Sequence, residues 1–334
     1  MEYFTLNIME IAKLPLTSLD SNAIHDDPGP FCMSYGFDLG PLIRSIQEFG
    51  VINPPIVVRQ GEGRVDVVSG YRRILALKNL QIGEIPCRDT TDSGFSPLQL
   101  LLLNLHENCF TREFNEVEKA MILARLVHYL SREEVIHSYM PLLSLPSREP
   151  TLDLFLNMER QSHIVKNVLA KGEVSVKAFE ALLEVESGFR LGLIKSILDL
   201  KLTYNQQLQF IELTVDICMR DGIDISELFN QASFVRIMEN EKLNLPQRTK
   251  AILELLRSIR FPRLTRAAES FQKAVSALGL PDGTRISHPP FFEGPDYRLE
   301  VPFKNGRQLK ERINILNNLD GIEALSDPWE KEDR

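Results

Sequence analysis

The chain has 334 residues, of which 43% are hydrophobic and 25% charged, so its composition excludes wholesale disorder and allows two or three domains. Its formal net charge of −8 gives no whole-chain attraction to nucleic acid or to an anionic membrane, so either kind of binding requires a local basic patch. The four cysteines form no Cys-x-x-Cys pair, which argues against zinc fingers and redox motifs.

No basic segment followed by an apolar one stands at the N-terminus, so we predict no secretory signal. The longest dense apolar run, residues 98–105, is far shorter than a membrane span. We therefore expect a cytoplasmic protein that does not contact a membrane.

The first hundred residues alternate between helical and extended patterns. Asp38 and Gly50 are suited to begin and end a short helix, and Gln60 begins a glycine-rich hairpin turn. The predicted elements are a helix over 41–49, strands over 56–59 and 64–68, a helix from Tyr71 and a strand over 84–88.

From Ser96 the pattern is helical to about residue 280, and Asn115-Glu116-Val117-Glu118 is a capping box that opens one of these helices. The fold class that we predict is α+β, with a small N-terminal α/β domain, an all-helical middle and a small C-terminal α/β domain. The predicted domains are 1–112, 113–245 and 246–334. Further helices are expected over about 131–139, 151–171, 175–185, 188–201, 205–220, 225–240, 263–278 and 306–319, with strands over 284–288 and 297–303.

The stretch from Val65 to Leu77 reads as a strand, a turn at Gly70 and a helix that begins close to Arg72 and Arg73. A helix start exposes backbone N–H groups without intrahelical partners, and its dipole attracts anions. Two guanidiniums at this point add forked donors that match phosphate oxygens. The pattern therefore predicts an anion site that favours a polyphosphate; the alternative is that the arginines lie on the surface or pair with acidic residues.

Three motifs follow one another in this part of the chain: Gly50-Val51-Ile52-Asn53-Pro54, Ser69-Gly70-Tyr71-Arg72-Arg73 and Glu107-Asn108. Together they resemble the N-terminal domain of ParB-type partition proteins over roughly residues 10–125. The resemblance implies a ParB/sulfiredoxin-like fold that holds CTP through its triphosphate and magnesium. It implies nucleotide contacts from Asn53, Gly70, Tyr71, Arg72, Arg73, Glu107, Asn108, Thr111 and Arg112, with Glu107 and Asn108 also near magnesium.

The chain departs from the family pattern at three of these positions. Tyr71 stands where the family often has Glu, which favours binding over hydrolysis and leaves at most a weak CTPase. Thr111 stands where the family has Arg, with Arg112 one residue later, and Asn53 replaces a common Gln. The sulfiredoxin-like enzymes carry a catalytic cysteine in the glycine turn, and its absence here disfavours thiol chemistry.

Residues 131–171 occupy the place of the family's helix-turn-helix DNA reader, so Arg132, Ser147 and Arg148 are the predicted DNA contacts. This segment carries equal numbers of acidic and basic side chains, which weakens the prediction. A second basic feature recurs every third residue, although Pro262 should interrupt it; its members are Arg257, Arg260, Arg263 and Arg266. A solvent-exposed helix face is the favoured interpretation, and contact with a phosphate backbone is the alternative.

The leading hypothesis is therefore a ParB-like protein that binds CTP and magnesium as a switch for DNA association, in DNA partition or transcription regulation. Its expected partners are DNA, a second copy of the chain through the C-terminal part, and a partner ATPase. One alternative is a phosphotransferase or nuclease on the same fold, against which Tyr71 argues. The other is a protein-interaction regulator whose nucleotide site is degenerate.

Overall fold

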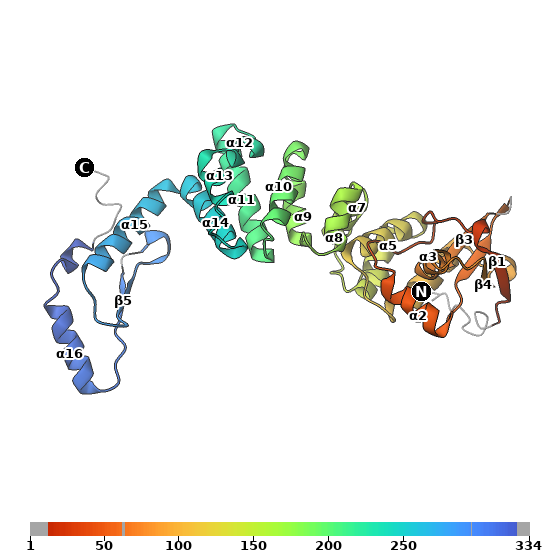
Figure 1. Ribbon diagram of the computed structural model, residues 1–334, viewed down its shortest axis with the longest axis horizontal. Helices are drawn as coiled ribbons and strands as arrows, with labels where there is room; N and C mark the ends of the chain where they lie inside the picture. Colours follow the sequence, from red (N-terminus) through yellow and green to blue (C-terminus); the bar gives the residue numbers. More distant parts are fainter. Residues whose placement is uncertain (1–12, 62–63, 295, 326–334) are drawn as a thin grey trace. The chain divides into compact units, whose positions relative to one another are not determined.

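The computed structural model describes residues 13–61, 64–294 and 296–325. Its contacts divide the chain into two compact units, Met1–Glu180 and Ala181–Arg334 (Figure 1). Each unit forms its own contacts and is considered by itself. The domain boundaries predicted near residues 112 and 245 stay predictions.

A four-stranded sheet forms the first part of the N-terminal unit. It has the order β1-β4-β2-β3, with β2 parallel to β4 and the other neighbours antiparallel. In register, Val57 lies opposite Val67 and Leu19 opposite Ile85. Valine and isoleucine favour these positions because their branched side chains pack well on a pleated surface. The strands are β1 (Leu16–Asp20), β2 (Ile56–Arg59), β3 (Val65–Ser69) and β4 (Glu84–Asp89).

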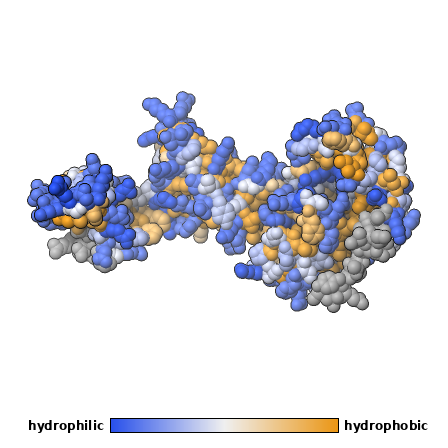
Figure 2. Space-filling view, turned by 90° about the horizontal axis from the view of Figure 1, so that it is seen from below, coloured by the Kyte–Doolittle hydropathy of each residue, from blue (hydrophilic) through white to orange (hydrophobic). Residues whose placement is uncertain are grey.

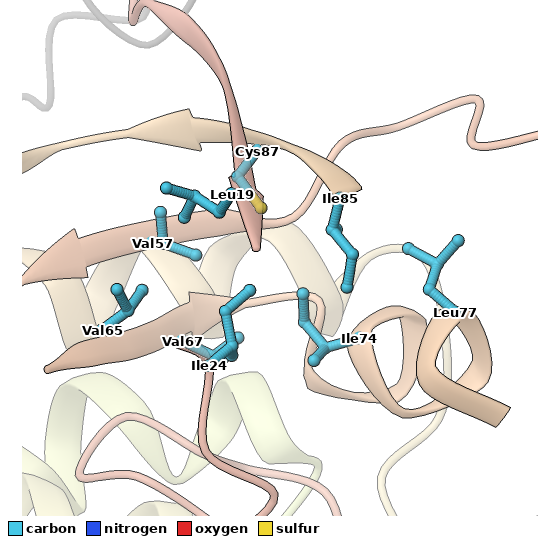
Figure 3. Packing of buried hydrophobic residues seen from close by; sticks show 9 residues of the cluster. All are labelled: Leu19, Ile24, Val57, Val65, Val67, Ile74, Leu77, Ile85 and Cys87. Atoms are coloured by element: carbon cyan, nitrogen blue, oxygen red, sulfur yellow. The ribbon is translucent and has the colours of Figure 1, made fainter. Parts of the chain in front are cut away.

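Helix α3 (Tyr71–Asn79) covers the hydrophobic core of this sheet. Ile74 and Leu77 are one helical turn apart, so both side chains reach the sheet, as Figure 3 shows. Burial of each large aliphatic side chain contributes about 1.5–3 kcal/mol. These buried contacts hold α3, which carries Arg72 and Arg73, against the sheet. The core cluster comprises Leu19, Ile24, Val57, Val65, Val67, Ile74, Leu77, Ile85 and Cys87.

Helix α2 (Gly40–Phe49) starts at a cap different from the one predicted. Leu39 is the residue before the helix and makes no side-chain cap; Asp38, one residue earlier, accepts the N–H of Gly40 at 2.9 Å. The predicted terminator is confirmed, since Gly50 follows the helix with φ 71°. A positive φ at that position is readily adopted by glycine.

Two longer helices follow the sheet, and both begin with capping boxes. Ser96 and Gln99 cap α4 (Pro97–Cys109), and the predicted box of Asn115 and Glu118 opens α5 (Glu116–Tyr129). Every residue of α4 from Leu100 to Leu105 is buried, and α4 contacts β3. A helix buried on all sides in this way holds its polar C-terminal end, Glu107 and Asn108, in a fixed position.

The remaining elements of the N-terminal unit are short. The helix predicted over 151–171 is wrong as a single element, because it is interrupted at Gln161 and a new helix begins after Ser162. Ser162 is a residue type that favours helix starts. These elements are α6 (Arg132–Glu134), the π-helical turn η4 (Val135–Tyr139), the 3-10 turn η5 (Pro141–Leu143), α7 (Glu149–Glu159) and α8 (His163–Ala170). The division between the two units falls within α9 (Val176–Leu183).

The second unit is mostly helical and carries a two-stranded antiparallel sheet. The helix predicted over 225–240 is interrupted at Gln231, and the predicted break at Pro262 is confirmed because one helix ends before Phe261 and the next starts after it. Its elements are α10 (Ser187–Asp199), α11 (Tyr204–Asp221), α12 (Ile225–Phe229), α13 (Ala232–Met238), α14 (Leu245–Arg260), α15 (Pro262–Ala277), β5 (Arg285–Ser287), β6 (Arg298–Glu300) and α16 (Gly306–Asn317).

Hydrophilic and hydrophobic residues both lie on the surface (Figure 2). On the face in Figure 2, hydrophilic and hydrophobic residues interleave over the helices. Within the described ranges, no helix is both long enough and apolar enough to cross a bilayer. The structure therefore combines α and β elements, is mostly helical, and has its larger sheet near the N-terminus.

Candidate phosphate-binding site

Gly70 connects β3 to α3 in a backbone conformation that favours glycine. Its φ of 91° and ψ of 23° lie in the left-handed region, which costs other L-residues about 1–2 kcal/mol. A Cβ atom at this position would lie 2.9 Å from Nε and 3.0 Å from Cζ of Arg73. Gly70 is therefore required twice, for the turn itself and for the space that the Arg73 side chain occupies above it.

Arg73 holds the turn against the end of α4. Its Nη2 donates to Oε1 of Glu107 at 2.8 Å, and its Nη1 donates to the backbone carbonyl of Asn53. Asn53 therefore contacts Arg73 through its backbone carbonyl and not through its side chain. The second carboxylate oxygen of Glu107, Oε2, is buried and has no hydrogen-bond partner among the described residues. That oxygen is free to accept a donor or to ligate a cation.

Arg72 and Arg112 converge on a single carboxylate, that of Glu118. Arg72 pairs with Oε1, and Arg112 pairs with Oε2 at 2.6 Å. The Glu118 side chain is only 1% exposed, and it also accepts the backbone N–H groups of Tyr35 at 3.1 Å and Asn115 at 3.2 Å. Four donors offset the cost of burying this charge. Glu118 thus fixes two guanidiniums that are far apart in the sequence.

Aromatic rings and neighbouring charges complete the surroundings of these arginines. The guanidinium of Arg72 lies 4.7 Å from the ring centre of Phe37, and that of Arg112 lies 4.4 Å from the ring centre of Phe114. Burial lowers the pKa of Arg72, as does the positive charge of Arg112, whereas Glu118 raises it. Arginine nevertheless stays protonated in proteins, so both groups are cations.

Asn108, near the end of α4, contacts the Arg112 side chain, whereas among the described contacts the Thr111 side chain bonds only to backbone carbonyls of α4. Asn108 accepts Nε of Arg112 at 3.1 Å through Oδ1 and donates to Oδ1 of Asn104 at 2.7 Å. The Thr111 hydroxyl donates to the backbone carbonyl of Glu107 at 2.9 Å and is exposed. Arg112 therefore lies with the other arginines, while Thr111 caps the C-terminus of α4.

Tyr71 contacts neither Glu107 nor Glu118 in the described hydrogen bonds, and its hydroxyl has another partner. Its hydroxyl donates to the backbone carbonyl of Asp26 at 2.6 Å, and its ring meets the ring of Phe37 edge-on at 6.2 Å. Burial raises the pKa of Tyr71 to about 12, with smaller contributions from negative charges nearby. Tyr71 therefore supports the start of α3 and remains a neutral phenol.

A magnesium ion at this site would need help from its ligand. The described residues contain no group of three or more His, Cys, Asp or Glu side chains that could hold a metal. Magnesium commonly takes one or two carboxylates, waters and substrate phosphates. The unpartnered Oε2 of Glu107 fits the protein's part of such a set, whereas Oδ1 of Asn108 is already bonded to Arg112.

The predicted DNA contacts all precede α7: Arg132 lies in α6, and Ser147 and Arg148 lie directly before α7. Arg132 pairs with Glu149 at 2.5 Å and with Asp153 at 2.6 Å, so its charge is balanced by two carboxylates of α7. Ser147 and Arg148 are exposed just before the first turn of that helix. Arg132 is therefore paired, whereas Arg148 forms no ion pair among the described contacts.

Sequence reasoning missed the residues that organise the cluster, above all Glu118 and Tyr35. Glu118 was recognisable as the last member of a capping box, and the box is present. Nothing in the sequence shows that its carboxylate also receives two arginines. Tyr35 contributes a backbone N–H, which leaves no residue-type signal.

Residues 5–100 match the family model described as ParB N-terminal domain. This part of the chain is therefore similar to the N-terminal domain of ParB proteins. The match covers Gly70, Arg72 and Arg73, and it ends before Glu107, Arg112 and Glu118. The arginines of α3 thus lie within the matched range, and their carboxylate partners, Glu107 and Glu118, lie after its end.

Curated relatives agree with this assignment. The chain is 25% identical over 215 residues to the probable chromosome-partitioning protein ParB of Vibrio cholerae, covering 62% of this chain and 69% of that protein. It is 25% identical over 181 residues to a nucleoid occlusion protein of Lysinibacillus sphaericus, covering 53% of this chain and 56% of that protein. The chain therefore spans only about half of the second relative.

Solved structures of ParB proteins are also similar. A truncated Caulobacter crescentus ParB complexed with CTP-gamma-S matches with a TM-score of 0.26 and 19% identity, covering 55% of this chain and 98% of that one. The same protein complexed to the parS site matches with a TM-score of 0.33 and 15% identity, covering 57% and 96%. Scores this low do not place individual residues.

Proposed function

We propose that Arg72, Arg73 and Arg112 bind the triphosphate of CTP with magnesium, and that the bound nucleotide controls association with DNA. The observation that carries this proposal is that Arg72 and Arg112 share one carboxylate, while Arg73, next to Arg72 at the start of α3, lies over the Gly70 turn. The process served would be DNA partition or nucleoid occlusion, as in the relatives. Transcription regulation is a further role of the same kind.

The helix start adds neutral donors to the charged ones. The first backbone N–H groups of α3 have no intrahelical acceptor and point toward the Gly70 turn. Arginine pairs with phosphate through two parallel hydrogen bonds, which fixes both position and orientation. The choice of cytidine comes from the family resemblance, since no described contact distinguishes one base from another.

The carboxylates explain why magnesium belongs in the proposal. Three arginines and two glutamates leave the cluster with a formal charge of +1, which is modest for a triphosphate. A divalent cation on the phosphates would reduce the charge to be neutralised. Glu107 would hold that ion through its free oxygen, Oε2. The ion when bound supplies charge neutralisation of the phosphates.

Hydrolysis would be slow or absent. An enzyme of this kind needs a carboxylate or another base to orient the attacking water. At the family's acidic position, Tyr71 instead donates its hydroxyl to a backbone carbonyl and stays neutral. We therefore propose a binding switch with at most weak CTPase activity, and the same observation argues against a phosphotransferase or nuclease.

The DNA part of the proposal is supported by the similarity to ParB proteins and by the position of α6 to α8 after the region that matches the ParB N-terminal domain. Arg148 is the side chain that we expect to contact phosphate, because Arg132 is already paired with two carboxylates. Phosphate contacts make affinity fall steeply with salt. DNA binding that weakens as salt rises supports the proposal, and no binding at low salt removes it.

Self-association would use the C-terminal part of the second unit. A two-stranded sheet is marginally stable alone. Leu299 in β6 is 48% exposed, Phe303 after that strand 54% and Ile313 on α16 51%, so apolar surface is available for a second copy. A homodimer is the proposed state, and a partner ATPase is proposed from the resemblance alone. Sedimentation of the full chain tests the first.

A second function has one observation in its favour. Glu118 already supplies both carboxylate oxygens to Arg72 and Arg112, so the nucleotide site could be degenerate and the chain a protein-interaction regulator. The two functions differ in one property that is simple to measure. Only the first requires that phosphate take these guanidiniums from Glu118 or share them with it.

Calorimetric titration of the full chain with each of the four ribonucleoside triphosphates, with and without magnesium, tests the proposed function. We expect binding that depends on magnesium and is strongest for CTP. Binding of none of the four would remove the nucleotide switch and favour the regulator. Arg72→Ala and Arg73→Ala should each weaken the binding, since each removes a charge-assisted phosphate contact.

A further inference from the structure

One short segment, residues 31–37, lies between the arginine cluster and α8. Its backbone forms three hydrogen bonds with residues in or next to the group of Arg72, Arg112 and Glu118. The carbonyl of Phe31 accepts from Asn104 at 2.6 Å, and the carbonyl of Met33 accepts from Arg112 at 3.3 Å. The N–H of Tyr35 donates to Glu118 at 3.1 Å. The segment's side chains add an acceptor and a ring for Arg72, from Ser34 at 3.3 Å and Phe37 at 4.7 Å.

On its other side, the same segment contacts α8 through Tyr35 and Gly36. The Tyr35 hydroxyl lies 3.1 Å from Oδ1 of Asn167 and 3.2 Å from Nδ1 of His163. The rings of Tyr35 and His163 are stacked, with centres 6.2 Å apart and planes 15° apart. A phenol can donate one hydrogen bond and accept another, so both contacts can be satisfied at once.

Gly36 makes this second contact tight. Its φ is 63°, and a Cβ atom built on it would lie only 2.8 Å from Cβ of Ala170. Backbone and helix therefore touch directly, without a side chain between them. The segment has no room to slide toward α8, so a displacement of the segment must move α8 as well or break the contact.

We propose that Tyr35 is a positioning residue that couples the occupancy of Arg72 and Arg112 to the position of α8. The inference rests on the proposed function and names the route by which the nucleotide site acts on the helices after the ParB domain. Its basis is that one residue bonds Glu118 through its backbone and α8 through its side chain.

The coupling follows from competition for the same donors. When a phosphate takes Arg72 and Arg112, the Glu118 carboxylate loses two of its four donors while it remains buried. Its remaining donors are the N–H groups of Tyr35 and Asn115. Residues 31–37 would then keep the bond from Tyr35 to Glu118, while Arg72 and Arg112, which also contact this segment, would move toward the phosphate. Because α8 follows α7, the change reaches the segment proposed to contact DNA. By linkage, DNA must affect the nucleotide in return.

Tyr35→Phe separates the two sides of the contact. It removes the bonds to Asn167 and His163 and keeps the backbone N–H that Glu118 accepts. Hydrogen exchange of the α8 amides in the full chain, with and without CTP and magnesium, is the measurement. Tyr129→Phe on α5 is the matched control, because it removes a phenol hydroxyl from another half-exposed tyrosine of the same unit.

In the wild type and in Tyr129→Phe, nucleotide should change the exchange rates of residues 163–170. In Tyr35→Phe the nucleotide should still bind, with an affinity within about twofold of the wild type, and the α8 response should fall by roughly two- to tenfold. An undiminished α8 response in Tyr35→Phe would overturn the proposal. So would a response in which Tyr129→Phe behaves in the same way as Tyr35→Phe.

A second comparison needs no nucleotide and so distinguishes the two possible failures. Glu118→Gln should speed exchange in α8 in the Tyr35 background and do so clearly less in the Tyr35→Phe background. Equal effects in the two backgrounds would show that Tyr35 carries no coupling. If the wild type binds no nucleotide, the proposed function fails while this double-mutant cycle still decides the role of Tyr35.

Discussion

Gly70→Ala is the perturbation whose consequences the structure defines most sharply. The left-handed backbone at Gly70 costs an alanine about 1–2 kcal/mol. The new Cβ would also lie 2.9–3.0 Å from three atoms of the Arg73 guanidinium, which must move and so leave Glu107. A displaced Arg73 would also lose its charge-assisted bond to phosphate, which is worth about 1.5–3 kcal/mol, or about 10- to 150-fold in phosphate affinity.

Gly94→Ala is the matched control for the backbone term. Gly94 has φ 72° and ψ 10°, and a Cβ atom on it would meet nothing within 4 Å. Urea unfolding should show that Gly94→Ala loses about 1–2 kcal/mol of stability, which is the backbone cost alone. Gly70→Ala should lose more than this, because the Arg73 contact is disturbed as well. Calorimetry should show weak CTP binding for Gly70→Ala alone. Equal CTP affinities in the two variants would refute the role assigned to Arg73.

The remaining predictions concern charge. Glu118→Gln should lower the free energy of unfolding by about 3–5 kcal/mol, because it leaves two guanidiniums without their carboxylate, and should strengthen CTP binding; an unchanged urea midpoint would contradict this. The pKa of Tyr71 is about 12 in the folded protein against about 10 in the unfolded chain, so its contribution to stability is complete below pH 10 and is lost as the pH rises toward 12. Alkaline unfolding of Tyr71→Phe should accordingly lack that part of the decline, and parallel curves for the two proteins would argue against it. Arg132→Ala should change stability by no more than about 1 kcal/mol, since its partners are exposed. The salt slope of DNA binding should be reduced by about one in Arg148→Ala and not in Arg132→Ala, and the opposite pattern would reverse their proposed roles.

Local signals in the sequence predicted most of the elements near the site. The strand before Gly70, the helix after it and the capping box of Asn115 and Glu118 all depend on neighbours within a few residues, and all three are present. The errors arose where a helix was drawn through a weak break. Ser162 and Gln231 are ordinary polar residues, so a helical period continues past them in the sequence although the chain turns there.

The geometry of the site depended on contacts between distant residues, which no local pattern reveals. Arg112 and Arg72 are brought together only because α4 is buried on all sides and α5 starts beside the segment that contains Tyr35. The anion site predicted at the Gly70 turn has the expected cations, yet their partners in the structure are carboxylates. The sequence offered that pairing as the alternative, and the structure contains it in the form of Glu107 and Glu118.

Phosphate and Glu118 would thus compete for the guanidiniums of Arg72 and Arg112. Titration of the full chain with CTP and magnesium, compared between the wild type, Arg72→Ala and Glu118→Gln, tests this competition most directly. We expect Arg72→Ala to bind at least about tenfold more weakly than the wild type, and Glu118→Gln to bind more tightly. Equal affinities in all three proteins, or no binding by any of them, would contradict this competition.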